Sequence, residues 1–121
     1  MPRAHVLIVE DNELVSQALR VLIESTGRRV SIASSVAETV AVGRSDPAAL
    51  VLVDLTLADG DGLAVIEPLR ATGSQTFVAL TGHDDPASAE RCLAAGCRDV
   101  LVKPVPAREF LARIEEWLPG R

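Results

Sequence analysis

Side chains that can do chemistry stand directly after short apolar runs of this sequence. In chain order they are Glu10, Asp11, Asp54, Thr81 and Lys103. Three carboxylates brought close together repel one another unless a cation joins them. Oxygen ligands that leave room for water favour Mg²⁺ over zinc or copper. The residue types therefore predict a magnesium site, if the fold brings the carboxylates to one place.

The hydroxyl and the amine extend this chemistry. A metal held by carboxylates beside a hydroxyl and an ammonium suits phosphoryl transfer, in which the protein neutralises charge on the phosphoryl oxygens. One carboxylate could then be the nucleophile and give an aspartyl phosphate. The chain has no Gly-rich loop ending in Lys-Ser or Lys-Thr, so ATP is not the expected direct donor. Lys103 is the only lysine among 12 basic residues; a site that needs a compact point charge and chance explain this equally well.

Five apolar runs bounded by turn residues are predicted to be the strands that position these groups. They are residues 5–9, 30–33, 50–53, 77–80 and 100–102. Short runs rich in Val, Leu and Ile suit strands buried on both faces of a parallel sheet. In such a sheet the ligand site lies beyond the carboxyl ends of the strands, so the chemical side chains should meet there. For each residue alone, a helix cap or a solvated charge is an alternative interpretation.

Helical patterns lie between the strands and predict an α/β fold with helices on both faces of the sheet. In the first pattern, Leu14, Ala18 and Leu22, with Val15 and Leu19, form an apolar stripe at helical spacing, which is the face expected to turn toward the core. The last pattern starts at a proline, and its expected buried face consists of Phe110, Leu111, Ile114, Trp117 and Leu118.

Local signals predict where the other helices begin and end. Ser35 and Glu38 have the spacing of a capping box. Pro68 is expected to kink or shorten its helix, because a proline inside a helix removes a hydrogen bond. Pro86 suits a first helical position, and Gly96 suits the end of the same helix.

Length and composition limit the class of protein. The chain has 121 residues, 48% of them hydrophobic, which predicts one domain over residues 1–121 with a core of about 5–118. The formal net charge is −5 and the basic residues are scattered, which argues against direct binding of nucleic acid. No apolar run approaches the roughly 20 residues of a membrane span, and the start lacks a signal peptide, so a cytoplasmic protein without membrane contact is expected. Cys92 and Cys97 are interpreted as buried spacers.

Four motifs together resemble the response-regulator receiver domains of two-component and chemotaxis systems, over residues 5–117. They are Val-Leu-Ile-Val-Glu10-Asp11-Asn12, Leu-Val-Asp54-Leu-Thr-Leu-Ala-Asp-Gly-Asp-Gly62, Ala-Leu-Thr81-Gly82 and Val-Leu-Val-Lys103-Pro104. The resemblance implies a flavodoxin-like, doubly wound sheet of five parallel strands in the order 2-1-3-4-5. It also implies a phosphoacceptor that takes its phosphoryl group from a sensor histidine kinase or a histidine phosphotransfer protein, with intrinsic autodephosphorylation.

The same resemblance assigns a role to each site residue. Asp54 is the expected phosphoacceptor, which attacks a phosphohistidine. Thr81 is expected to hydrogen-bond the phosphoryl oxygen, and Lys103 to pair with Asp54 and later with its phosphate. The Lys103–Pro104 bond resembles the cis peptide of the family. The expected ligands of Mg²⁺ are Asp11 and Asp54 directly, Glu10 through water, and the backbone carbonyl of Thr56.

Two residues depart from the family pattern. Ala58 stands where the family usually has a proline, which allows a looser loop with little effect on chemistry. Val100 stands where a Tyr or Phe is usual, and valine has no ring to rotate inward when Thr81 moves. Phosphorylation is therefore expected to alter the loop from Gly82 to Asp85 and the start of the following helix, with smaller changes around Val100.

Two other functions remain as alternatives. One is a degenerate receiver that is never phosphorylated and serves as a binding module. The other is an aspartyl-phosphate phosphatase of the haloacid-dehalogenase class, whose nucleophile would follow the first strand with a second Asp two residues on. Position 56 is Thr, and the first strand is followed by Glu10-Asp11. The chain is thus not expected to be an enzyme that turns over external substrates.

Overall fold

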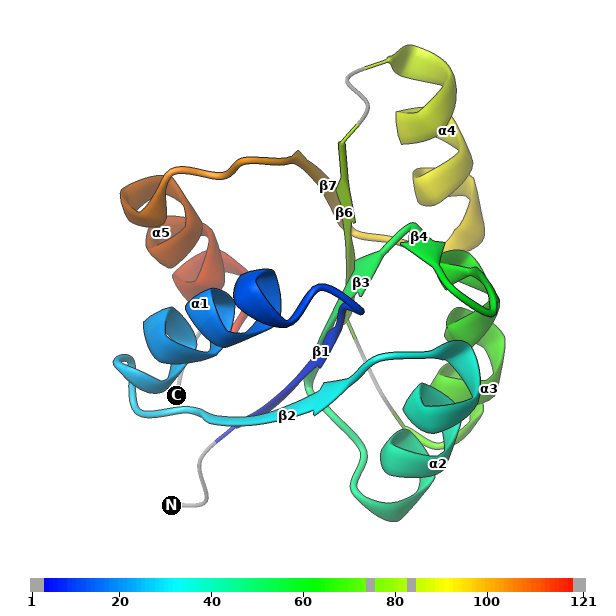
Figure 1. Ribbon diagram of the computed structural model, residues 1–121, viewed down its shortest axis with the longest axis horizontal. Coiled ribbons are helices and arrows are strands. Elements are labelled where there is room, and N and C mark those ends of the chain that lie inside the picture. The colour runs from blue at the N-terminus through cyan, green and yellow to red at the C-terminus, as the bar shows by residue number, and fades with distance from the viewer. Residues whose placement is uncertain (1–3, 74–75, 83–84, 119–121) are drawn as a thin grey trace.

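The structure is a computed structural model that describes residues 4–73, 76–82 and 85–118. Within these residues, five parallel strands form one sheet in the order β2-β1-β3-β6-β7 (Figure 1). Their bounds are β1 His5–Val9, β2 Arg29–Ala33, β3 Leu50–Asp54, β6 Thr76–Thr81 and β7 Asp99–Val102. Counted along the sheet strands alone, this is the predicted order 2-1-3-4-5, so the fold prediction is confirmed.

Helices cover both faces of the sheet. On one side lie α1 (Glu13–Glu24) and α5 (Ala107–Trp117), and on the other lie α2 (Val36–Ser45), α3 (Ile66–Ala71) and α4 (Pro86–Ala95) (Figure 1). Successive residues of a strand point to opposite faces of the sheet, so β3 contributes side chains to the hydrophobic clusters on both sides. Its Leu50 and Leu52 pack in the cluster under α1 and α5. Its Val51 and Val53 pack in the cluster that α3 and α4 complete.

The buried face of α1 differs from the predicted stripe. Leu14 is 85% exposed and Ala18 is also exposed, whereas Ile23 is fully buried. Leu19 and Leu22 of the predicted stripe pack with Ile23 in the cluster under α1 and α5, and Val15 is half-buried. Apolar residues occupy two adjacent stripes of this helix, and spacing alone cannot tell which one the sheet covers. The predicted stripe is therefore confirmed at Leu19 and Leu22 and wrong at Leu14 and Ala18.

The predicted helix ends are mostly confirmed. The Ser35 hydroxyl accepts from the Glu38 amide at 3.0 Å, although the Glu38 carboxylate accepts from the neighbouring Ser34 amide and not from that of Ser35. Pro68 lies in α3, which spans only six residues after a 3₁₀ turn, η1 (Gly62–Val65). The start and end of α4 have the predicted residues. Asp85 caps its first turn, and Gly96 ends it at φ 115°, a conformation that favours glycine.

The buried face of α5 is as predicted for four of its five residues. Phe110, Ile114, Trp117 and Leu118 are buried, and Leu111 is half-buried. The rings of Phe110 and Trp117 meet edge to face with centroids 6.4 Å apart. These residues pack in one cluster with apolar residues of β1, β3, β6 and β7. None of the helices in the described part of the chain is long and apolar enough to cross a membrane.

The thiols of Cys92 and Cys97 are predicted to react slowly in the folded protein. Both are free and buried, and burial raises the pKa of Cys97 to about 12 and also raises that of Cys92. Because the thiolate is the reactive form, alkylation by iodoacetamide at pH 8 should be far slower in the native protein than in urea. The raised pKa favours the thiol form on folding, so its contribution to stability is lost as the pH rises from about 9 to 12. Thiols that react equally fast in both states would contradict this prediction.

Candidate functional site

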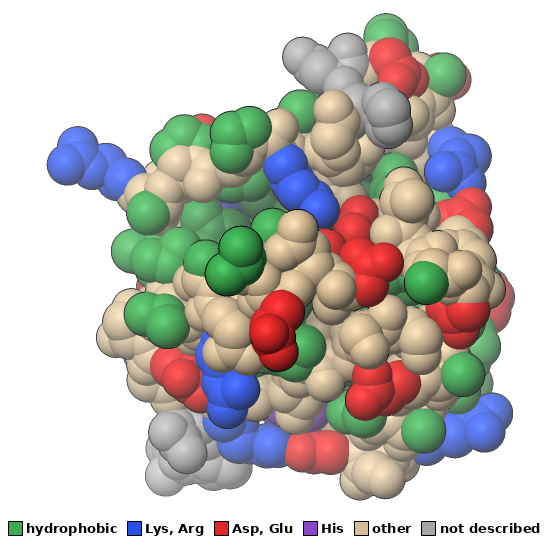
Figure 2. Space-filling view, in the orientation of Figure 1, with side chains coloured by type: hydrophobic (Ala, Val, Ile, Leu, Met, Phe, Trp, Pro, Cys, Tyr) green, Lys and Arg blue, Asp and Glu red, His purple; other side chains and the backbone are tan. Residues whose placement is uncertain are grey.

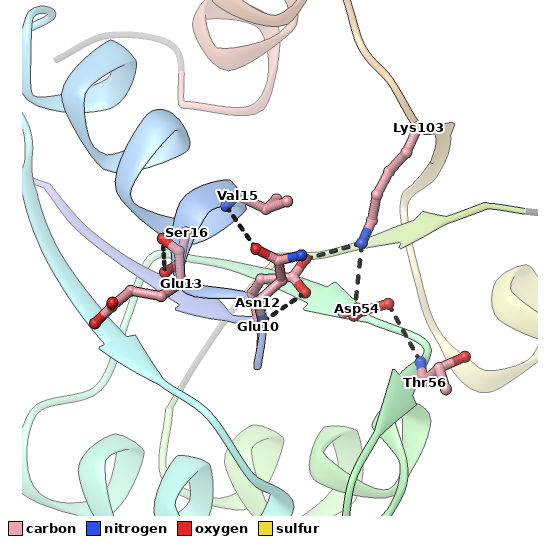
Figure 3. Close-up of polar contacts among 8 residues, drawn as sticks. All are labelled: Glu10, Asn12, Glu13, Val15, Ser16, Asp54, Thr56 and Lys103. Carbon is pink, nitrogen blue, oxygen red and sulfur yellow. Dashed lines mark hydrogen bonds and ion pairs between the residues drawn. The ribbon is translucent and has the colours of Figure 1, made fainter.

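The fold brings the predicted side chains to one edge of the sheet. Glu10 directly follows β1, Asp54 is the last residue of β3, Thr81 is the last residue of β6, and Lys103 directly follows β7. Since β3 lies between β1 and β6, Asp54 has the central position. Figure 3 shows Lys103 extending from its loop toward Glu10 and Asp54. The edge of the sheet that ends in these residues is therefore the candidate site.

Three carboxylates form a cluster of the kind that holds a metal ion. Glu10, Asp11 and Asp54 each offer one oxygen, and these oxygens all lie within 4.8 Å of one another. Glu10 and Asp54 are buried, at 2% and 7% exposure, whereas Asp11 is exposed. A hollow of about 320 Å³ between α1 and the β2–α2 connection adjoins Glu10 and Asp11. The donor set consists only of oxygen, and it is open to solvent on one side, which fits Mg²⁺.

Lys103 contacts two of these carboxylates. Its Nζ donates a hydrogen bond to Glu10 Oε1 at 2.9 Å and lies 3.5 Å from Asp54 Oδ2. The backbone holds the lysine in place, because its amide donates to the Thr81 carbonyl at 2.7 Å, and the Lys103–Pro104 peptide bond is cis. The resemblance gave Asp54 as the partner of this lysine, and the structure adds Glu10 as the closer one.

Burial and charge shift the pKa values of Glu10 and Lys103. Burial is the largest influence on Glu10 and raises its pKa, although the hydrogen bond from Lys103 opposes that rise. Burial alone would lower the pKa of Lys103, but the hydrogen bond to Glu10 and the negative charge of Asp54 outweigh it and raise that pKa. Lys103 therefore carries a positive charge next to the phosphoacceptor candidate.

Backbone groups orient the carboxylates. The Thr56 amide donates to Asp54 Oδ1 at 3.2 Å, and the Asn12 amide donates to Glu10 Oε2 at 3.2 Å (Figure 3). Asn12 also caps α1 by accepting from the amide of Val15. Both carboxylates are thus held by the turn that follows their own strand. This leaves the second oxygen of each available to face Lys103.

The turn after β3 contains a short hairpin that the strand pattern did not predict. It consists of β4 (Thr56–Leu57) and β5 (Gly60–Asp61), which pair antiparallel. The Asp-Gly-Asp-Gly run at residues 59–62 is a turn signal that could have revealed it. Its carboxylates join the hairpin to two helices. Asp59 accepts from the Val36 amide at the start of α2, and Asp61 pairs with Arg91 of α4 at 2.5 Å.

The two residues that depart from the family pattern lie in the hairpin turn and in β7. Ala58 is in the hairpin turn, between β4 and β5. Val100 is half-buried in β7, opposite Ala79 of β6, and packs against the cluster under α3 and α4. On the face of the molecule shown in Figure 2, a group of acidic side chains lies near the centre, with a basic side chain next to it.

Known proteins are similar in sequence to this protein over nearly the whole chain. Residues 6–115 match the family model of the response regulator receiver domain. The acid tolerance regulatory protein ActR of Rhizobium meliloti (strain 1021) is 37% identical over 114 residues, which are 93% of this chain and 59% of that protein. The KDP operon transcriptional regulatory protein KdpE of Escherichia coli (strain K12) is 32% identical over 110 residues, which are 91% of this chain and 49% of that protein. The chain thus spans only about half the length of these relatives.

Solved structures share the fold. A two-component response regulator from Clostridium difficile superposes with a TM-score of 0.90 at 23% identity, over 96% of each chain. The receiver domain of the sensor histidine kinase PA1611 from Pseudomonas aeruginosa PAO1 gives a TM-score of 0.85 at 26% identity, over 98% of this chain and 99% of that one. The latter is described with a magnesium ion coordinated in its active site cleft. With the family model matched over most of its length, the chain belongs to the response regulator receiver domains of two-component systems.

Proposed function

We propose that this domain accepts a phosphoryl group on Asp54 from the phosphohistidine of a sensor histidine kinase or a histidine phosphotransfer protein. The observation that carries the proposal is the position of the Asp54 carboxylate, central in the sheet, next to two further carboxylates and 3.5 Å from Lys103. An oxygen of Asp54 attacks the phosphorus, the phosphorus–nitrogen bond breaks, and its electron pair returns to the imidazole. The product is an aspartyl phosphate.

The carboxylate cluster fits Mg²⁺ as the cofactor. Asp11 and Asp54 would hold the ion directly, Glu10 through water, and Thr56 through its backbone carbonyl. When bound, Mg²⁺ offsets the repulsion among the carboxylates and the negative charge of the incoming phosphoryl group. Among the supporting facts are the oxygen-only donor set and the magnesium ion described for the PA1611 receiver domain.

Two further side chains would stabilise the transferred group. Lys103 exchanges part of its contact with Glu10 and Asp54 for the phosphoryl oxygens, which carry more charge in the transition state. Thr81, at the end of the neighbouring strand, donates its hydroxyl to another phosphoryl oxygen. Water later hydrolyses the acyl phosphate, so the domain dephosphorylates itself and turns over no external substrate. We place this chemistry in the cytoplasm, where sensor kinases have their phosphohistidine.

A small phosphoryl donor tests the proposal without a kinase. The protein is incubated with acetyl phosphate and Mg²⁺, and its intact mass is measured. One phosphoryl adduct is expected, which base removes and EDTA prevents. If no donor gives an adduct, the domain is a degenerate receiver that serves as a binding module. Release of phosphate from a phosphomonoester would instead support the phosphatase alternative.

Phosphorylation is predicted to change the surface next to the β6–α4 connection. Val100 cannot move a ring between two positions, and a ligand shifts an equilibrium only through contacts that differ between the two states. The groups drawn toward the phosphate are Thr81 and Lys103, so Gly82, Asp85 and the first turn of α4 should show the largest changes. Residues 83–84 of this connection lie outside the described residues.

Amide chemical shifts with and without beryllofluoride measure this effect. Large shifts at Gly82 and the first turn of α4, with smaller shifts around Val100, are the expected result. Large shifts confined to β7 and α5, with a quiet Gly82, would show that the signal leaves by another route.

A further inference from the structure

We infer that Gly62 is a positioning residue for the phosphoacceptor, an inference that rests on the proposed function. Gly62 is buried and begins η1, directly after the hairpin. A Cβ at this position would lie 2.0 Å from the carbonyl oxygen of Asp54, 3.0 Å from its carbonyl carbon and 2.8 Å from Val53 Cγ1. The φ of Gly62 is not among the positive values in this chain, so the position requires glycine for space and not for backbone conformation.

Two of these three atoms, including the nearest one, belong to the backbone of the phosphoacceptor itself. This backbone is held on its other side, because Asp54 pairs with Leu80 of β6 and the Leu55 amide donates to the Leu80 carbonyl at 3.2 Å. The Gly62 amide donates to the Leu55 carbonyl at 3.0 Å, which keeps η1 against the end of β3. No change of rotamer can relieve the overlap, so either η1 or residues 54–56 must move.

A movement of residues 54–56 would displace the groups on which the proposed chemistry depends. The carboxylate of Asp54 is oriented by the Thr56 amide at 3.2 Å, and the Thr56 carbonyl is the proposed backbone ligand of Mg²⁺. Misplacement of reacting groups by about 1 Å can cost roughly a hundredfold in rate. The absence of a side chain at Gly62 therefore allows the end of β3 and the hairpin to hold Asp54 in its reactive position.

Gly43 provides a matched control. It is buried in α2, and a Cβ there would lie 2.1 Å from Leu69 Cδ2, an overlap as severe as that at Gly62. The atom in its way, however, is the end of a leucine side chain on α3, which can rotate. Gly43→Ala thus adds the same methyl group to the same core cluster without touching the backbone of Asp54.

The experiment compares Gly62→Ala and Gly43→Ala with the wild-type protein. For each, circular dichroism and urea unfolding establish that the protein is folded under the assay conditions. Phosphorylation by acetyl phosphate is then measured at saturating Mg²⁺ over a range of donor concentrations, and Mg²⁺ affinity is measured by titration. Gly62→Ala is expected to lower the maximal rate at least tenfold and to weaken Mg²⁺ binding, whereas Gly43→Ala should keep both within about twofold.

The outcomes distinguish this inference from the proposed function. A folded Gly62→Ala protein with the rate and Mg²⁺ affinity of Gly43→Ala would overturn the role of Gly62 and leave the proposed function intact. Failure of the wild-type protein to take a phosphoryl group would overturn the proposed function, and the inference with it.

If Gly62→Ala does not fold, the wild-type protein supplies the second measurement. The Gly62 amide should then shift on addition of Mg²⁺ and beryllofluoride as strongly as those of residues 54–56, and more than that of Gly43. An unshifted Gly62 amide would overturn the inference.

Discussion

Asp54→Asn is expected to abolish the phosphoryl adduct completely. Asparagine keeps the size of the side chain and an oxygen that can accept from the Thr56 amide, but an amide oxygen is not a nucleophile of comparable strength. The substitution therefore removes the reaction while it leaves the turn in place. Intact mass after incubation with acetyl phosphate and Mg²⁺ should show no adduct, where the wild-type protein shows one.

Asp59→Asn is the control for this substitution. Asp59 lies in the turn of the hairpin that follows the phosphoacceptor, and its carboxylate caps α2. Because it does not belong to the carboxylate cluster, its variant should form the adduct as the wild-type protein does. An adduct that persists in Asp54→Asn would mean that another residue accepts the phosphoryl group.

Lys103→Met is expected to slow phosphorylation by about 10²-fold, the usual effect of removing one group that stabilises developing charge. Methionine, like lysine, has an unbranched side chain, so the change removes the ammonium group and little of the apolar stem. It also leaves the buried Glu10 carboxylate without its 2.9 Å donor. An unsatisfied buried polar group costs about 1–3 kcal/mol, so the free energy of unfolding should fall by about that amount. The rate of phosphorylation is measured from the intact mass in quenched reactions, and the free energy of unfolding is measured by urea unfolding.

Arg113→Gln controls for the loss of one positive charge. Arg113 pairs with Asp99 of β7 at 2.7 Å, and it touches none of the three carboxylates at the carboxyl ends of the strands. Its variant should keep the wild-type rate of phosphorylation. If Lys103→Met reacts as fast as Arg113→Gln, the lysine does not act on the phosphoryl group, and its role is confined to its contact with Glu10.

The sheet and the edge that carries the site were predictable because buried parallel strands have a simple signature. Runs such as Leu50–Val53 are apolar at every position, since both faces of the strand are covered. Once the runs are recognised as parallel strands, the residues after them must share one edge. Asp54 and Lys103 are 49 residues apart in the sequence, yet their side chains lie 3.5 Å apart for this reason.

Other features could not be read from local patterns. The exposed position of Leu14 depends on which of two apolar stripes of α1 meets the sheet, and that is a tertiary choice. Lys103 follows β7 and Glu10 follows β1, with β3 and β6 between them in the sheet. Their hydrogen bond therefore depends on how far both side chains reach. The need for glycine at position 62 arises from a contact with the carbonyl of Asp54, and a pattern of residue types does not show such a contact.

The most direct measurement of the central claim locates the phosphoryl group on the chain. Borohydride reduces an aspartyl phosphate to homoserine, which leaves a stable mass change at the modified residue. The protein is treated with acetyl phosphate and Mg²⁺, reduced, digested and analysed by tandem mass spectrometry. Homoserine at position 54, absent when EDTA is present, is the predicted result. Homoserine at position 11, or a stable phosphoryl group on another residue, would contradict the assignment of Asp54 as the phosphoacceptor.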